Sequence, residues 1–315
     1  MSLAIGVDVG GTKLAAGVVD AHGRITERLE RLTPSSSPPA TAATISEAVN
    51  ELRGRHRVDA VGVGAAGYVD EARSTVLFAP HLAWRDEPLK KELERLVGCP
   101  VVVENDANAS VWAELRFGAA AGHRHVVMVT IGTGIGTGII IDGNLYRGHW
   151  GIGGEAGHYR VVPDGRLCDC GNRGCWEQYA SGNALAAEAR MLARQSPAGA
   201  ARLLELGGGT PDGIDGPQVT QAAAEGDPAA TQCFQTVGTW LGQGLADLAA
   251  ILDPGCFVIG GGVSAAGDLL LEPARSQLSA ALTGRGFRIP TEVKAAVLGA
   301  DAGLVGAAEL ARSAA

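Results

Sequence analysis

The sequence lacks any run of about 18 consecutive apolar residues, the minimum that a membrane-spanning helix needs. Its N-terminus, MSLAIGVDVG, has neither the basic start nor the apolar stretch of a secretory signal peptide. Basic residues are also few: 26 Lys and Arg stand against 34 Asp and Glu, a net charge of -8. Surfaces that bind nucleic acid are usually basic, so DNA binding is not expected. We therefore expect a cytoplasmic protein that binds neither nucleic acid nor membrane.

Cysteine is scarce, with six among 315 residues, yet three of the six lie between residues 168 and 175. A histidine, His158, precedes them closely. This gathering of soft ligands fits a disulfide knot, a redox pair or a metal site. In a reducing cytosol, clustered cysteines are more often metal ligands or redox groups than structural disulfides.

The first third of the chain predicts an α/β architecture. With 46% hydrophobic residues, 315 residues can form two domains with a core each. β-type runs and turns in residues 3–32 predict a three-stranded antiparallel meander. A helix through Ile45 and Leu52 follows, then an apolar strand, then a second helix with Asp86 as N-cap and Pro88 in its first turn. This alternation predicts a largely parallel sheet that continues the meander.

A second unit is expected to begin near residue 125, because VTIGTGIGTGIII echoes the opening IGVDVGGTKLAAGVV. The dipeptide Asp142-Gly143 predicts a hairpin there. Residues 183–252 are Ala-rich and predict helices, with an interruption near residue 206. The last helix, 301–315, carries small residues that favour close packing against a sheet.

Three glycine-rich turns follow apolar strand-like runs: DVGGTK at 8–13, TIGTGIG at 130–136 and VIGGGVS at 258–264. Glycine lets backbone N–H groups approach phosphate oxygens closely, because no Cβ stands in the way. None of the three fits a P-loop or a dinucleotide-binding fingerprint. Two hairpin loops of this kind indicate instead a phosphate clamp between domains.

Asn105 and Asp106 stand just beyond the apolar strand CPVVVE, at the start of a predicted helix. Ligands bind at such strand ends in open α/β sheets. A carboxylate at such a position can take part in chemistry, and Asp106 is our candidate catalytic group. The alternative is that Asp106 merely caps a helix beginning at Ala107.

The order of the motifs DVGGTK, ENDAN, GTGIGTG, GGEAGH, CDCGNRGCWE and GGGVS resembles the ROK family of sugar kinases over residues 3 to 308. The motifs are most similar to those of bacterial glucokinases of the actinobacterial type. The resemblance implies an actin-like ATPase (ribonuclease H-like) fold, with two α/β domains around a central cleft. The small domain would span 1–120, completed by the helix 301–315, and the large one 121–300, including a zinc-binding sugar-site segment.

The resemblance also implies the site residues. Asp106 would be the catalytic base that accepts the proton of the sugar 6-hydroxyl. The sugar would contact Gly67, Asn105, Asp106, Glu155, His158 and Glu177. The nucleotide would be held by Asp8, Gly10, Thr12, Lys13, Gly132, Thr133, Gly134, Gly261 and Gly262, with Asp8 near Mg²⁺. His81 stands where many family members have Asn, which puts a secondary sugar contact in doubt.

A zinc site is the favoured interpretation of the clustered cysteines. The set of His158, Cys168, Cys170 and Cys175 offers one nitrogen and three sulfurs, which suits a closed tetrahedral Zn²⁺ site. A redox pair would use C-x-x-C, whereas the close pair here is C-x-C. A structural zinc would hold GGEAGH and GCWE in register around the sugar. Core positions are expected for the other cysteines, Cys99, Cys233 and Cys256.

We therefore expect an ATP-dependent glucokinase that uses Mg²⁺ and carries a structural Zn²⁺. The resemblance implies a homodimer or a homotetramer. Other hexoses, N-acetylmannosamine and polyphosphate as donor stay open. A sugar-sensing transcriptional regulator is the alternative from another class, although the chain shows no basic DNA-binding module before LAIGVDVGGTK.

Overall fold

The computed structural model describes residues 3–314, which divide into two compact units. The first unit contains the residues up to 128, residues 138–154 and the residues from 296 onward. The second contains 129–137 and 155–295. The domain limits expected from the sequence, at residues 120 and 300, stay a prediction. The expected α/β class with two compact parts is confirmed.

The sheet of the first unit has the strand order β3-β2-β1-β4-β8. Its strands are β1 (Leu3–Val9), β2 (Lys13–Val19), β3 (Ile25–Leu32), β4 (Val58–Ala65) and β8 (Val101–Asn105). Strands β1 to β3 pair antiparallel, whereas β4 lies parallel to both β1 and β8. The predicted meander with a parallel continuation is therefore confirmed. The carboxyl ends of β1, β4 and β8 meet at one edge of this sheet.

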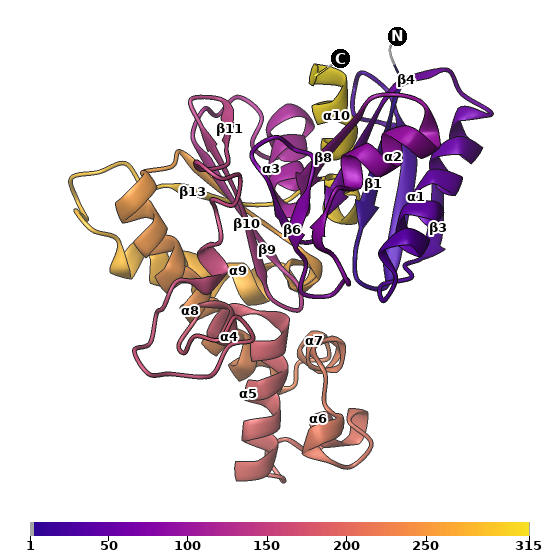
Figure 1. Cartoon of the computed structure of the whole chain (residues 1–315). Coiled ribbons are helices and arrows are strands. Elements are labelled where there is room, and N and C mark those ends of the chain that lie inside the picture. The colour runs from indigo at the N-terminus through magenta and orange to yellow at the C-terminus, as the bar shows by residue number, and fades with distance from the viewer. Residues whose placement is uncertain (1–2, 315) are drawn as a thin grey trace. The chain divides into compact units, whose positions relative to one another are not determined.

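Two helices cover each face of this sheet (Figure 1). On one face lie α1 (Pro38–Arg53) and α2 (Leu89–Val97), and on the other α3 (Asp106–Phe117) and α10 (Ala302–Ala314), which follows the short turn η4 (Gly299–Asp301). The small residues of α10 allow very close packing, as the sequence predicted. A Cβ on Gly62 of β4 would lie 1.8 Å from the backbone oxygen of Ala307.

The predicted start of the second helix is wrong. Asp86 lies in β7 (Arg85–Glu87) with a φ of 50°, and α2 begins only at Leu89, after Pro88 as N-cap. The reason is tertiary: β7 pairs with β6 (Val76–Phe78), which pairs with β5 (Tyr68–Val69) in a small three-stranded sheet. The backbone of residues 85–87 is therefore committed to a strand.

The second large sheet has the order β11-β10-β9-β12-β13. Its strands are β9 (Val126–Ile131), β10 (Ile135–Ile141), β11 (Asn144–Tyr146), β12 (Cys256–Gly260) and β13 (Glu292–Ala295). Asp142 and Gly143 turn the β10–β11 hairpin with φ of 53° and 78°, as predicted for this dipeptide.

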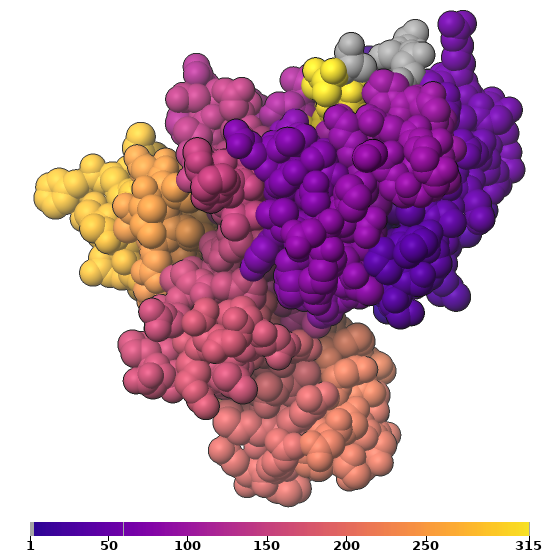
Figure 2. Space-filling view, in the orientation of Figure 1, coloured from indigo at the N-terminus to yellow at the C-terminus, as the bar shows by residue number. Residues whose placement is uncertain are grey.

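The second unit is rich in helices, as expected for 183–252. They are α4 (Glu177–Ala180), α5 (Gly182–Gln195), α6 (Ala201–Leu206), α7 (Gly216–Ala224), α8 (Pro228–Leu252) and α9 (Asp268–Ala281), with the short turns η1 (Ala156–His158), η2 (Pro211–Gly213) and η3 (Gly262–Ala266). Helices α5, α6 and α7 pack on one another, and Figure 2 shows their atoms as one continuous salmon and orange surface. Within residues 3–314, no helix is both long enough and apolar enough to cross a membrane.

Candidate functional site

Asp106 lies where β8 ends and α3 begins. The N-cap of α3 is Asn105, whose side-chain oxygen accepts the N–H of Asn108 at 3.0 Å. The alternative in which Asp106 caps a helix starting at Ala107 is therefore wrong, because Asp106 is already the first helical residue. Its Oδ1 accepts the Asn105 amide at 3.0 Å and the Ala107 N–H at 2.9 Å.

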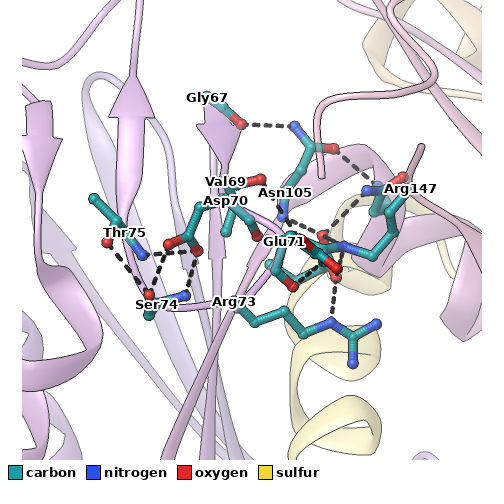
Figure 3. Close-up of polar contacts among 11 residues, drawn as sticks. Gly67, Val69, Asp70, Glu71, Arg73, Ser74, Thr75, Asn105 and Arg147 are labelled. Carbon is teal, nitrogen blue, oxygen red and sulfur yellow. Dashed lines mark hydrogen bonds and ion pairs between the residues drawn. The ribbon is translucent and has the colours of Figure 1, made fainter. Parts of the chain in front are cut away.

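Gly67 belongs to the same corner of the first unit. Its carbonyl accepts the Asn105 side-chain amide at 3.1 Å (Figure 3). A Cβ on Gly67 would lie 2.4 Å from the backbone oxygen of Phe78, so no larger residue fits without a shift. The structure thus brings together Gly67, Asn105 and Asp106, three of the residues expected at the sugar.

Two carboxyl groups at this sheet edge have perturbed acidity. Burial raises the pKa of Asp8 to about 7, helped by the negative charges of Asp106 and Asp301 and opposed by Arg28. Burial also raises the pKa of Asp106, although hydrogen bonds from Ala107 and Asn105 counteract it. Two neighbouring carboxylates with little positive charge around them can bind a proton or a divalent cation.

The turn DVGGTK joins β1 to β2 at the same edge. Gly10 donates its N–H to the carbonyl of Lys13 at 3.0 Å, and the carbonyl of Thr12 accepts from Thr33 at 3.0 Å. The exposed His81 lies beside this turn, because a Cβ on Gly11 would be 2.8 Å from the His81 Cβ. Asp8, Gly10, Thr12 and Lys13 therefore gather at one strand end.

Two glycine loops meet in the second unit. Gly132, Thr133 and Gly134 connect β9 to β10, and the carbonyl of Gly132 accepts the N–H of Gly182 at 2.8 Å. Gly261 follows β12 with a φ of 82°, and a Cβ there would lie 2.5 Å from the backbone nitrogen of Ile131. The loop carrying Gly261 and Gly262 thus packs directly against the strand end that leads into Gly132.

Glu155, His158 and Glu177 also belong to the second unit. Glu155 precedes η1, and its carbonyl accepts the N–H of His158 at 3.1 Å. The Glu177 carboxylate lies against the first glycine loop, since a Cβ on Gly134 would be 2.5 Å from Oε2. Its other oxygen is 3.6 Å from Nδ1 of His158.

The four predicted metal ligands come together beside Glu177. The ligand atoms of His158, Cys168, Cys170 and Cys175 all lie within 4.8 Å of one another. The sulfurs of Cys170 and Cys175 are 3.6 Å apart, as are Cys168 Sγ and His158 Nδ1. A disulfide would need about 2.05 Å, whereas two sulfurs on one tetrahedral zinc are about 3.8 Å apart. The donor set and its spacing therefore fit a Zn²⁺ ion.

The remaining cysteines lie outside this cluster. Cys233 and Cys256 are buried, which raises the pKa of their thiols to about 12 and about 11, and makes them unreactive near neutral pH. Cys99 is half-buried against the core of the first unit. The predicted core roles are thus confirmed for two of the three.

Sequence reasoning missed a buried ionic cluster next to Asn105. Glu104, Arg73 and Arg147 form it, although the two arginines are distant in sequence. The available signal was the acid at position 104, which interrupts the apolar run of β8. No feature of the sequence near Glu104 indicated that Arg73 and Arg147 would pair with it.

Residues 4–314 match the ROK family. A glucokinase of Streptomyces coelicolor is 53% identical over 99% of this chain and 98% of its own length. The xylose repressor of Bacillus subtilis is 29% identical over 87% of this chain and 68% of its own. The crystal structure of a ROK family glucokinase from Streptomyces griseus, in complex with glucose and AMPPNP, is 54% identical, has a TM-score of 0.91 and covers 99% of this chain and 100% of its own. The chain belongs to the ROK family.

Proposed function

We propose that this chain transfers the γ-phosphoryl group of ATP to the 6-hydroxyl of glucose. The main observation behind this proposal is that Asp106 lies beside Asn105 and Gly67. Asp8 and the DVGGTK turn lie at the same edge of the sheet. Support also comes from the full-length similarity to the Streptomyces glucokinase and to the relative crystallised with glucose and AMPPNP.

Asp106 accepts the hydroxyl proton as the oxygen attacks phosphorus. A base works best when its pKa lies near the operating pH, and burial moves the pKa of Asp106 in that direction. The Asn105 amide and the Ala107 N–H hold its Oδ1, which fixes the direction of the carboxylate. Sugar hydroxyls lose water on binding and must be paired again. The groups that pair them are Gly67, Asn105, Glu155, His158 and Glu177.

The glycine turns hold the nucleotide. Gly10, Thr12, Lys13, Gly132, Thr133 and Gly134 bind the phosphates, and Gly261 and Gly262 flank the adenosine. Asp8 is the acid that would hold Mg²⁺, and the ion would supply positive charge that offsets the charge of the ATP phosphates. The Asp8 carboxyl, with its pKa of about 7, loses its proton readily once a cation is near.

Zn²⁺ bound by His158, Cys168, Cys170 and Cys175 has a structural role. Four protein ligands leave no open coordination position for substrate or water. By holding the ion, these four residues would tie η1 to the segment before α4, and so set Glu155 and Glu177 relative to one another.

The protein is a homo-oligomer, a dimer or a tetramer. Both units expose large apolar side chains, including Trp150 at 68%, Phe287 at 97% and Ile289 at 89%. Such side chains are candidates for subunit contacts. Light scattering on the purified protein measures the state directly, and a strictly monomeric mass would contradict it.

A coupled assay of several sugars against several phosphate donors tests the function. We expect glucose with ATP to give the highest kcat/KM, with fructose and N-acetylmannosamine lower by as much as about 10⁴-fold, because a site that pairs hydroxyls rejects a poorly matched sugar. Comparable rates on N-acetylmannosamine, or with polyphosphate as donor, would contradict the assignment.

A gel shift at low salt tests the alternative that the protein is a transcriptional regulator, and no DNA binding is expected.

A further inference from the structure

A buried carboxylate, Glu104, stands immediately before Asn105 and Asp106 on β8. Its side chain is only 1% exposed. Oε1 accepts the N–H of Asn105 at 2.9 Å and the side-chain amide of Asn108 at 3.1 Å. Glu104 therefore holds both the backbone of Asn105 and the first turn of α3.

Two arginines neutralise this carboxylate. Nε of Arg73 and Nε of Arg147 each lie 2.9 Å from Oε2, and Nε of Arg147 also donates to Oε1 at 3.1 Å. Among the described residues, Oε2 accepts no well-directed hydrogen bond, so its pairing is chiefly Coulombic. A buried charge that loses one partner is strongly destabilised. The geometry around Glu104 thus depends on both arginines.

Arg147 extends the contact to a second segment, the loop after β5. Its terminal nitrogens donate to the carbonyls of Glu71 at 2.9 Å and Asp70 at 2.8 Å. Figure 3 shows Arg147 beside the segment that carries Asp70 and Glu71, and Nε of the same guanidinium contacts Glu104. Arg147 itself follows the β10–β11 hairpin and has an 11% exposed side chain.

The loop also has hydrogen bonds of its own. Asp70 Oδ1 accepts the N–H groups of Ser74 at 2.7 Å and Thr75 at 3.1 Å, and Arg73 has a φ of 54° at the head of this turn. The same chain segment begins with Gly67, whose carbonyl receives the Asn105 amide at 3.1 Å. Both anchors of Asn105 are therefore tied to Arg147, one through Glu104 and one through the loop.

We propose that Arg147 is a positioning residue for phosphoryl transfer. It sets the orientation of the Asn105–Asp106 pair by binding both Glu104 and the loop after β5, through the carbonyls of Asp70 and Glu71. This inference rests on the proposed role of Asp106 as the base. A fork of several N–H donors is needed to reach a carboxylate and two carbonyls together, which Lys cannot do although it keeps the charge. Small misplacements of a reacting group have large rate effects.

The test compares Arg147→Lys with Arg124→Lys. Arg124 lies near the other end of the same hairpin, pairs with Asp142 at 3.2 Å and is 73% exposed, so its replacement should leave kcat unchanged. Arg147→Lys should fold, bind ATP normally and lose about 10-fold or more in kcat. A kcat within about 2-fold of the Arg124→Lys control would overturn the proposal.

A double-mutant cycle with Asp106→Asn separates positioning from general stability. If Arg147 acts through Asp106, Arg147→Lys should lower kcat by less than about 2-fold once Asp106 is already Asn. Two independent, multiplying losses would mean that Arg147 acts elsewhere, and the inference would fail while Asp106 kept its role. Full activity of Asp106→Asn alone would instead remove the proposed base.

A second variant covers the case in which Arg147→Lys does not fold. Combining Glu104→Gln with Arg147→Met removes the two most buried charges of the cluster. The Arg73 guanidinium also loses its carboxylate partner in this variant, but its side chain is 31% exposed and keeps contact with water. This variant should fold and bind ATP, yet show the same loss of kcat. Wild-type kcat in the folded double variant would overturn the proposal.

Discussion

At the scale of the single residue, the proposed mechanism depends on the orientation of the Asp106 carboxylate. Asp106→Asn keeps the shape of the side chain, but the amide cannot accept the hydroxyl proton. We expect kcat to fall by about 10²-fold or more, with glucose binding and circular dichroism close to normal. Steady-state kinetics and calorimetric glucose binding measure the two quantities. Retention of more than roughly a tenth of kcat would make Asp106 an orienting group only.

Asp8 makes stability depend on pH. Its pKa is about 7 in the folded chain against 3.8 as the ordinary value, so ionisation is harder in the folded state. The folded state therefore loses stability as pH rises from about 4 to about 7, and the loss is constant above that. Without Mg²⁺ and ATP, Asp8→Asn should be nearly neutral at pH 4 and stabilise by about 1–4 kcal/mol at pH 8.

Denaturant unfolding at the two pH values measures this difference, and Asp20→Asn is the matched control. Backbone N–H groups of Arg24 and His22 lower the pKa of Asp20, so its replacement should destabilise rather than stabilise at pH 8. An equal effect of Asp8→Asn at both pH values would show that Asp8 ionises freely. The stabilised variant should also lose activity, because it lacks the carboxylate that we propose holds Mg²⁺.

At the scale of the element, the clustered side chains of His158, Cys168, Cys170 and Cys175 lie in a segment with almost no regular structure. Between η1 and α4 the chain has isolated bridges such as Arg160 with Cys175, but no helix or long strand. Purified protein should contain close to one zinc per chain. Binding free energy at such sites, about 10 kcal/mol or more, is also folding free energy. Cys170→Ser should therefore loosen residues 155–180 and weaken glucose binding more than ATP binding.

Hydrogen exchange over residues 155–180, metal content by atomic emission and the two binding constants check this prediction. Cys99→Ser is the control, because that half-buried thiol lies outside the cluster. Normal glucose affinity with an inactive chemical step would indicate a catalytic zinc instead. A zinc-free preparation with full activity would contradict any role for the metal.

At the scale of the whole molecule, the last helix completes the first sheet. Helix α10 packs on β1 and β4 so closely that Gly62→Ala would place a methyl group 1.8 Å from a backbone oxygen. The helix must then shift, at a cost of about 1–3 kcal/mol or more. Gly54→Ala is the control, since its φ is -64° and the nearest atom lies 3.4 Å from the new Cβ. Thermal unfolding should separate the two variants clearly, and equal Tm values would contradict the close packing.

Much of this arrangement was predictable, and for local reasons. The meander, the Asp142-Gly143 hairpin and the helices of 183–252 follow from turn chemistry and periodicity within a few residues. The gathering of His158, Cys168, Cys170 and Cys175 was predictable as well, because one histidine and three cysteines at short spacing match the ligand number and softness that zinc prefers. Their role as metal ligands stays a prediction. The sequence interpretation was wrong at two positions. Asp86 lies in a strand and not at a helix start, because residues 85–87 pair with β6, which is distant in sequence. The N-cap of α3 is Asn105 and not Asp106, because the Asn105 side-chain oxygen accepts the backbone N–H in the first turn.

By itself the sequence determined the family, the α/β class and the identity of the residues that can do chemistry, since each of these is a property of residue types at short spacing. Only the tertiary structure decided how Asp106 is held. Arg147 contacts Glu104, which is 43 residues away in the sequence, and Asp70, which is 77 residues away. Such contacts leave no periodic or local mark in a sequence, because they form only when the hairpin, the loop and β8 fold against one another.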